Sequence, residues 1–126
     1  MKAVLDTSVL IATDVSPLDG ELAVSAASLA ELHFGVLVAT DPAVRAHRLR
    51  RLSEIQRRFD PLPVDAAVAA SYGELAARVA GSGRQPRSRV MDLLVAATAH
   101  AHGARLYTRN PGDLAGLEDI VEIAAV

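Results

Sequence analysis

Hydrophobic and polar residues follow two different periods along this chain, and the two patterns alternate. Short apolar runs over residues 2–5 and 104–108 are typical of buried strands. Weaker strand candidates are residues 21–24, 61–64 and 120–123. Strands that alternate with helices predict an α/β fold, in which right-handed crossovers connect a parallel sheet of four to five strands.

Helices are expected between these runs, where apolar residues recur three or four positions apart and capping residues mark the starts. Asp41 followed by Pro42 is a clear helix start, and Ser25, Asp65 and Ser88 are expected to cap three further helices. The expected helices cover residues 9–12, 25 to about 39, 65–81 and 88 to about 102, together with a segment from Pro42 whose apolar stripe is Leu49, Leu52, Ile55 and Phe59. The helix after Ser88 is apolar nearly all round, which predicts that it is buried.

The composition limits the possible classes of protein. With 126 residues, of which 51% are hydrophobic, the chain is expected to fold as a single domain over residues 1–126. It has no cysteine, which excludes disulfides and thiolate metal sites and fits a reducing cytoplasm. No apolar stretch is long enough to span a bilayer, and Asp6 interrupts the only run that resembles a signal peptide. We therefore expect a cytoplasmic protein without membrane contact.

The basic residues are unevenly distributed. All of them except Lys2 are arginines, and they cluster within residues 45–58 and 84–89. Any single arginine is best interpreted as part of a solvated helix face. As a group, they have the charge to meet a phosphate backbone.

Four acidic residues stand where a carboxylate has two competing interpretations. Asp6 follows the first strand, where it either caps a helix or serves a ligand site at the carboxyl edge of the sheet. Glu31 either forms a capping box with Ser28 or lies in the middle of an apolar helix, and we favour the helix. Asp92 either stabilises the helix by complementing its dipole or has a functional role. The surrounding sequence is apolar, which favours the functional role. Asp113 lies in a Pro-Gly turn, where a structural role is the simpler interpretation.

The expected topology brings these four carboxylates together. Because parallel strands end at one edge of a sheet and the following helices begin there, Asp6, Asp92 and Asp113 should converge. Glu31 can join them from its own helix. Carboxylates that converge without basic partners repel one another, so a cation is expected. Without cysteine or a histidine triad, that cation is a hard one with oxygen ligands, Mg²⁺ or Mn²⁺, which suits phosphodiester hydrolysis.

Polar residues next to these carboxylates have the chemistry to support them. Hydroxyl and amide groups there are expected to hold a carboxylate or a phosphate by hydrogen bonds. The candidates are Thr7, Ser8, Thr108 and Asn110. Arg109 and the arginines of residues 84–89 are expected to bind substrate phosphates.

Four motifs in this order resemble those of PIN-domain ribonucleases, in particular the VapC toxins of VapBC toxin–antitoxin systems. They are VLDTSVLIA at residues 4–12, SLAELHFG at 28–35, MDLLVAATA at 91–99 and TRNPGD at 108–113. Together they cover essentially the whole chain. Asp6, Glu31, Asp92 and Asp113 match the acidic quartet of the family, whereas Leu114 stands where the family often has an aromatic residue.

The resemblance implies a PIN-like α/β/α sandwich with a central parallel sheet. It also implies a Mg²⁺- or Mn²⁺-dependent endoribonuclease that acts on RNA such as tRNA or rRNA. The expected partners are a second copy of the chain and a cognate VapB-type antitoxin that covers the acidic site, in a heterotetramer or larger assembly. The corresponding mechanism is in-line attack by an activated water, with the 3′ oxygen as leaving group.

Three alternatives remain open from the residues alone. The same site chemistry would serve a metal-dependent DNA nuclease. A phosphatase with Asp6 as nucleophile usually has a second aspartate two residues on, where this chain has Ser8. A catalytically silent PIN-like module that binds RNA or protein would have no use for four mutually repelling carboxylates.

Overall fold

The computed structural model describes residues 1–126 and contains a four-stranded, fully parallel sheet in the order β2-β1-β3-β4. The strands are β1 (Lys2–Leu5), β2 (Glu21–Ala23), β3 (Arg105–Thr108) and β4 (Ile123–Ala125). The predicted α/β class and parallel pairing are therefore confirmed. β1 and β3 are the two central strands, and Leu5 pairs with Tyr107 near the carboxyl ends of both.

Two of the weaker strand predictions were wrong. Residues 61–64 form only an isolated bridge between Leu62 and Ser25, because the prolines on either side of Leu62 have no N–H to extend a ladder. The last strand begins at Ile123 and not at Ile120, since the N–H groups of Ile120 and Val121 both donate to the carbonyl of Leu117 in a turn.

The helices are α1 (Thr7–Leu10), α2 (Ala26–Val38), α3 (Pro42–Arg58), α4 (Ala66–Gly81) and α5 (Val90–Ala101), with short 3₁₀ helices η1 (Pro86–Arg89) and η2 (Pro111–Leu114). Ser25, Asp41 and Asp65 cap α2, α3 and α4 as predicted. Ser88 does not cap α5. Its hydroxyl donates to the carbonyl of Gln85, the residue before η1, and the N-cap of α5 is Arg89, one residue later than predicted.

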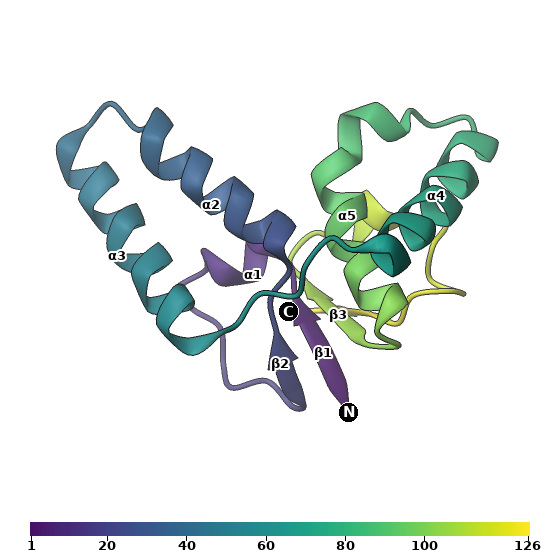
Figure 1. Cartoon of the computed structure of the whole chain (residues 1–126), viewed down its shortest axis with the longest axis horizontal. Helices are drawn as coiled ribbons and strands as arrows, with labels where there is room; N and C mark the ends of the chain where they lie inside the picture. The colour runs from purple at the N-terminus through teal and green to yellow at the C-terminus, as the bar shows by residue number, and fades with distance from the viewer.

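Helices cover both faces of the sheet, which confirms the three-layer architecture. The sheet therefore has a hydrophobic core on each face. On β1, Val4 packs in the core formed with α4 and α5, while Ala3 and Leu5 pack in the core formed with α1 and α3. On β3, Leu106 and Tyr107 divide between the two cores in the same way. Figure 1 shows the two helix layers diverging upward from the sheet, with α2 and α3 on the left and α4 and α5 on the right.

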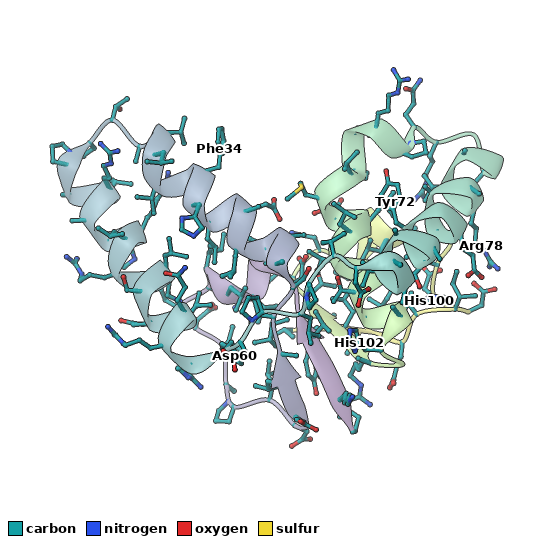
Figure 2. The ribbon with its side chains drawn as sticks, in the orientation of Figure 1. Phe34, Asp60, Tyr72, Arg78, His100 and His102 are labelled. Atoms are coloured by element: carbon teal, nitrogen blue, oxygen red, sulfur yellow. The ribbon has the colours of Figure 1, made fainter.

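The outer end of the α2–α3 pair is less buried than its apolar sequence predicted. Leu52 and Ile55 of the predicted stripe are buried, but Leu49 is 51% exposed. Phe34 and Leu37 of α2 are also exposed, and Figure 2 shows Phe34 pointing away from the ribbon. Of this stripe, Ile55 packs into the core beside Leu5 of β1 and Leu10 of α1. No helix of the structure is long and apolar enough to cross a membrane.

Candidate active site at the carboxyl edge of the sheet

Asp6 is the most firmly held carboxylate at this edge. It follows β1 directly and is only 8% exposed. Its Oδ2 accepts hydrogen bonds from the Ser8 hydroxyl at 2.6 Å, the Thr108 hydroxyl at 3.1 Å and the Ser8 N–H at 3.4 Å. Oδ1 accepts no hydrogen bond and is not buried, so one oxygen orients the group and the other remains free for a ligand.

Both interpretations of Asp6 are therefore correct at once. It is the N-cap of α1, because its side chain accepts from the Ser8 N–H, and it also presents an unused oxygen at the sheet edge. The two hydroxyls that hold it are held in turn by backbone groups. Ser8 Oγ accepts from the Arg109 N–H and Thr108 Oγ1 accepts from the Asn110 N–H, each at 3.0 Å.

Glu31 reaches this edge from the middle of α2, as the helix interpretation predicted. The Thr7 hydroxyl donates to Glu31 Oε1 at 2.8 Å and lies 2.9 Å from the Ser28 hydroxyl. Ser28 is one turn before Glu31 and is fully buried. Thr7 thus connects the residue after Asp6 to Glu31. Sequence reasoning considered Ser28 only as a helix cap and missed this role, although the three-residue spacing placed both side chains on one helix face.

Asp92 and Asp113 complete the group from α5 and η2. Asp92 lies in the first turn of α5, and Asp113 lies in η2, just past β3. Between them stands Arg89, whose Nη1 is 3.7 Å from Asp92 Oδ2 and 3.2 Å from Asp113 Oδ2. Sequence reasoning placed Arg89 among substrate-binding arginines and did not foresee this pairing. Arg89 lies three residues before Asp92, and this spacing alone could have indicated an ion pair between them.

The charges of these carboxylates affect one another. Burial raises the pKa of Glu31, and repulsion from Asp92 and Asp6 raises it further, against the hydrogen bond from Thr7 that lowers it. Burial also raises the pKa of Asp92, with added repulsion from Asp6 and Asp113, and Arg89 opposes that shift. Raised carboxylate pKa values that come from burial and mutual repulsion are typical of functional sites.

The donor set fits a hard divalent cation by its chemistry, since every candidate ligand is a carboxylate oxygen and no thiolate or imidazole is present. In this structure, no group of three or more such side chains stands close enough to hold one ion together. Asp92 and Asp113 have side chains about one-third exposed, and their only ion-pair partner is Arg89. Asp6, in contrast, is already fixed.

The other predicted support residues fall into two groups. Thr7, Ser8 and Thr108 bond to the carboxylates directly, while Asn110 contributes only its backbone N–H. The guanidinium of Arg109 is engaged elsewhere: it forms an ion pair with Asp14, and this contact lowers the pKa of Asp14. Arg109 therefore reaches the site through its backbone and not through its charge.

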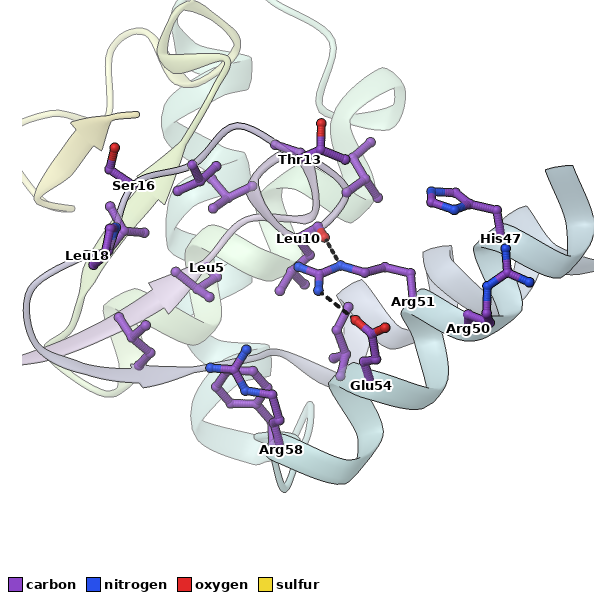
Figure 3. A pocket seen from close by; sticks show the side chains of 18 residues that line it. Leu5, Leu10, Thr13, Ser16, Leu18, His47, Arg50, Arg51, Glu54 and Arg58 are labelled. Atoms are coloured by element: carbon purple, nitrogen blue, oxygen red, sulfur yellow. Dashed lines mark hydrogen bonds and ion pairs between the residues drawn. The ribbon is translucent and has the colours of Figure 1, made fainter.

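The arginine cluster on α3 lies at a separate cavity. This cavity has a volume of about 570 Å³ and is bounded by α1, the loop that follows it, and α3. Figure 3 shows Arg50, Arg51 and Arg58 around it, with Arg51 bonded to the Leu10 carbonyl at 2.7 Å and paired with Glu54 at 3.3 Å. None of the four carboxylates lines it. The α3 arginines therefore form a group of their own, separate from the four carboxylates.

The histidines also lie apart from the carboxylates. Figure 2 shows His100 and His102 toward the lower end of α5, and Asp92 belongs to the first turn of that helix. His100 bonds to Ser71 Oγ at 2.8 Å, which ties α5 to α4.

Comparisons with known proteins agree with this geometry. The model of the PIN domain family matches residues 3–115. Ribonuclease VapC4 of Mycobacterium tuberculosis is 34% identical over 125 residues, covering 94% of this chain and 93% of that protein. Ribonuclease VapC5 of the same species is 35% identical over 129 residues, covering 98% and 93%.

A solved structure shares the fold over nearly its whole length. It is the crystal structure of VapBC-5, a member of the VapBC family of toxin–antitoxin systems from Mycobacterium tuberculosis. Its TM-score to this chain is 0.84 at 34% sequence identity, and the match covers 99% of this chain and 97% of that one. The likeness therefore includes the strands and helices that carry all four carboxylates.

Proposed function

This chain belongs to the PIN-domain family of VapC ribonucleases, and we propose that it hydrolyses RNA phosphodiester bonds with a divalent cation, Mg²⁺ or Mn²⁺. Asp6, Glu31, Asp92 and Asp113 would hold the cation. The observation that carries this proposal is the state of Asp6, which has one oxygen fixed by three donors and the other free. A carboxylate that served only as a helix cap would not need the second anchor from Thr108, which lies 102 positions away in the chain.

The residues of this chain have separable roles in such a reaction. A bound cation supplies water activation and neutralises charge on the leaving 3′ oxygen. Asp6 provides the rigid ligand, because Ser8 and Thr108 prevent its rotation. Glu31, held by Thr7 and with a raised pKa, is placed to accept a proton from the attacking water. Asp92 and Asp113, whose side chains are more exposed than that of Asp6, would supply further carboxylate oxygens to the cation.

The partners of this chain are part of the same proposal. The solved relative is a toxin–antitoxin system, so we propose a VapB-type antitoxin as the inhibitor of this chain and structured RNA, tRNA or rRNA, as its target. A homodimer that binds antitoxin as a heterotetramer or larger assembly is the proposed oligomeric state. Light scattering on the purified chain, alone and co-expressed with the antitoxin, measures this directly.

The test is a cleavage assay on total bacterial RNA with protein freed of any co-purified partner. It compares Mg²⁺, Mn²⁺ and EDTA, with Asp6→Asn as the inactive variant. Asp41→Asn is the matched control, because Asp41 is an exposed cap of α3 and asparagine caps equally well. We expect metal-dependent cuts by the wild type and by Asp41→Asn, and none by Asp6→Asn.

The ends of the products test the mechanism, and sequencing them identifies the target. Attack by water leaves a 3′-hydroxyl and a 5′-phosphate, whereas attack by the 2′-hydroxyl of the RNA leaves a 2′,3′-cyclic phosphate. The cyclic product would refute the proposed chemistry. Cleavage of DNA but not RNA would favour the DNA nuclease alternative, and absence of both cleavage and Mn²⁺ binding would favour a silent interaction module.

A further inference from the structure

Arg89 is the only basic residue that forms an ion pair with any of the four carboxylates. A single nitrogen, Nη1, faces both Asp92 and Asp113. At 3.7 Å, the contact with Asp92 is too long for a hydrogen bond. All three side chains are between 36% and 43% exposed. One cation thus stands between two anions from different elements, in contacts that solvent can loosen.

The position of Arg89 conflicts with a divalent cation shared by the same two carboxylates. A guanidinium and a metal ion cannot both occupy the space between Asp92 and Asp113, since they repel each other and compete for the same oxygens. The observation that no three carboxylates converge on one point agrees with this, because Arg89 separates two of them. Binding of a metal ion therefore requires Arg89 to move.

A place for the displaced guanidinium lies next to the site. A cavity of about 460 Å³ opens beside Asp113 and is lined mainly by polar groups, among them Arg84, Gln85, Ser88 and Arg89. Arg84 already donates to the Ala115 carbonyl at 2.9 Å, which holds its guanidinium at this wall. The two guanidinium groups and the Gln85 side-chain amide are donors that can bind a phosphate group, whereas the Ser88 hydroxyl already donates to the Gln85 carbonyl.

We propose that Arg89 is a displaceable counter-ion of the Asp92–Asp113 pair, which a divalent cation releases to bind an RNA phosphate in the adjoining cavity. This inference rests on the proposed metal-dependent nuclease function and adds a residue to its substrate site. Before metal binds, Arg89 neutralises part of the acidic cluster. Afterwards its charge is available to the strand of RNA that runs past the scissile bond.

The experiment measures Mn²⁺ binding by calorimetry, without RNA, for wild type, Arg89→Met, Arg89→Lys and Arg87→Met. Methionine keeps much of the length of the side chain and removes its charge. Arg87 is the matched control. It was expected among the phosphate-binding arginines of residues 84–89, but unlike Arg84 and Arg89 it does not line the adjoining cavity. It lies in the same 3₁₀ helix as Arg89, is exposed and forms no ion pair. Loss of two exposed ion pairs should raise the Mn²⁺ affinity of Arg89→Met by about 2- to 30-fold. Arg89→Lys and Arg87→Met should stay near wild type.

A second measurement tests the phosphate contact. At saturating Mn²⁺, the RNA substrate identified by the cleavage assay is titrated with each variant. Loss of one charge-assisted hydrogen bond to phosphate should lower kcat/KM of Arg89→Met by roughly tenfold or more, mainly through KM. Arg89→Lys should recover part of this loss. Arg87→Met should change kcat/KM much less, although it loses the same charge from the same helix.

The possible outcomes separate this inference from the function on which it rests. Tighter Mn²⁺ binding by Arg89→Met with a raised KM for RNA supports it. Unchanged or weaker Mn²⁺ binding by Arg89→Met, with normal binding by the wild type, overturns it and leaves the nuclease proposal intact. A KM that is equal for Arg89→Met and Arg87→Met overturns the phosphate contact. Absence of Mn²⁺ binding in every variant overturns both proposals.

Discussion

Thr108→Val isolates the contribution of one hydroxyl to the site. Thr108 is 1% exposed, and its Oγ1 lies between Asp6 Oδ2 at 3.1 Å and the Asn110 N–H at 3.0 Å. Valine has nearly the same shape, so core packing is retained while both hydrogen bonds are lost. Asp6 keeps its bonds from Ser8 but loses the anchor that comes from the neighbouring strand.

The size of the effect follows from these contacts. A hydrogen bond to a charged group contributes about 1.5–3 kcal/mol, and exposed Asn110 can bond to water instead. The free energy of unfolding of the metal-free protein should therefore fall by about 2 kcal/mol. Removing a group that orients a metal ligand typically lowers metal affinity by about 10- to 100-fold. We expect a loss of that size in Mn²⁺ affinity.

Urea denaturation in EDTA measures the first effect and calorimetry with Mn²⁺ the second. Thr98→Val is the matched control. Thr98 is also a fully buried threonine, but its hydroxyl bonds to the Leu94 carbonyl and to Ser25, not to a carboxylate. It should lose about 1 kcal/mol of stability while Mn²⁺ affinity stays at the wild-type value. Wild-type Mn²⁺ affinity in Thr108→Val would refute the argument, as would an equal loss of affinity in both variants.

Three further predictions concern charge and metal in the same cluster. Asp92→Asn removes a partly buried charge that neighbouring carboxylates repel. It should therefore raise the free energy of unfolding of the metal-free protein at pH 7 by up to about 1 kcal/mol, measured by urea denaturation. A destabilised variant would contradict this prediction. Because the folded state raises the pKa of Glu31 above its ordinary 4.5, it holds that proton more tightly than the unfolded chain, so stability falls as the pH rises from 4.5 through the raised value. Urea midpoints across this range should show a shallower fall for Glu31→Gln, and an unchanged slope would refute the assignment. Mn²⁺ at about 100 times its dissociation constant should raise the free energy of unfolding by roughly 2.7 kcal/mol, and Asp6→Asn should abolish the increase.

The local parts of the fold were the easiest to predict. Helix caps such as Ser25, Asp41 and Asp65 act on residues two or three positions away, so a short window of sequence contains the interaction. The prediction that Ser88 caps α5 was wrong, because another short-range interaction competes with the cap. Pro86 opens a 3₁₀ turn in which the Ser88 side chain bonds backward to Gln85, and this turn competes with a cap.

The position of Asp6 and Asp113 at one edge of the sheet followed from strand order, but the partners of the four carboxylates did not. Placing Asp6 and Asp113 at one edge needs only parallel strands and short connections. Knowing that Arg89 stands between Asp92 and Asp113, or that Arg109 turns to Asp14, needs the direction of long side chains. Those directions depend on packing between elements that are distant in sequence, which no periodicity records.

The contacts around Asp6 also explain why the site and the fold depend on each other. Asp6 directly follows β1 and its anchor Thr108 lies in β3, so the two residues are brought together only when these strands pair. Asp6 is therefore not held rigidly in a chain in which β1 and β3 are unpaired, whereas the acidic residues that repel one another are present in any state of the chain. In the proposed function, a cation that binds the completed site would act on the whole folding equilibrium, and Arg89 would supply part of the compensating charge without the cation. If Arg89 is the displaceable counter-ion that we propose, its contacts have to be weak, because a counter-ion held by strong hydrogen bonds would stabilise the metal-free protein and compete with the metal.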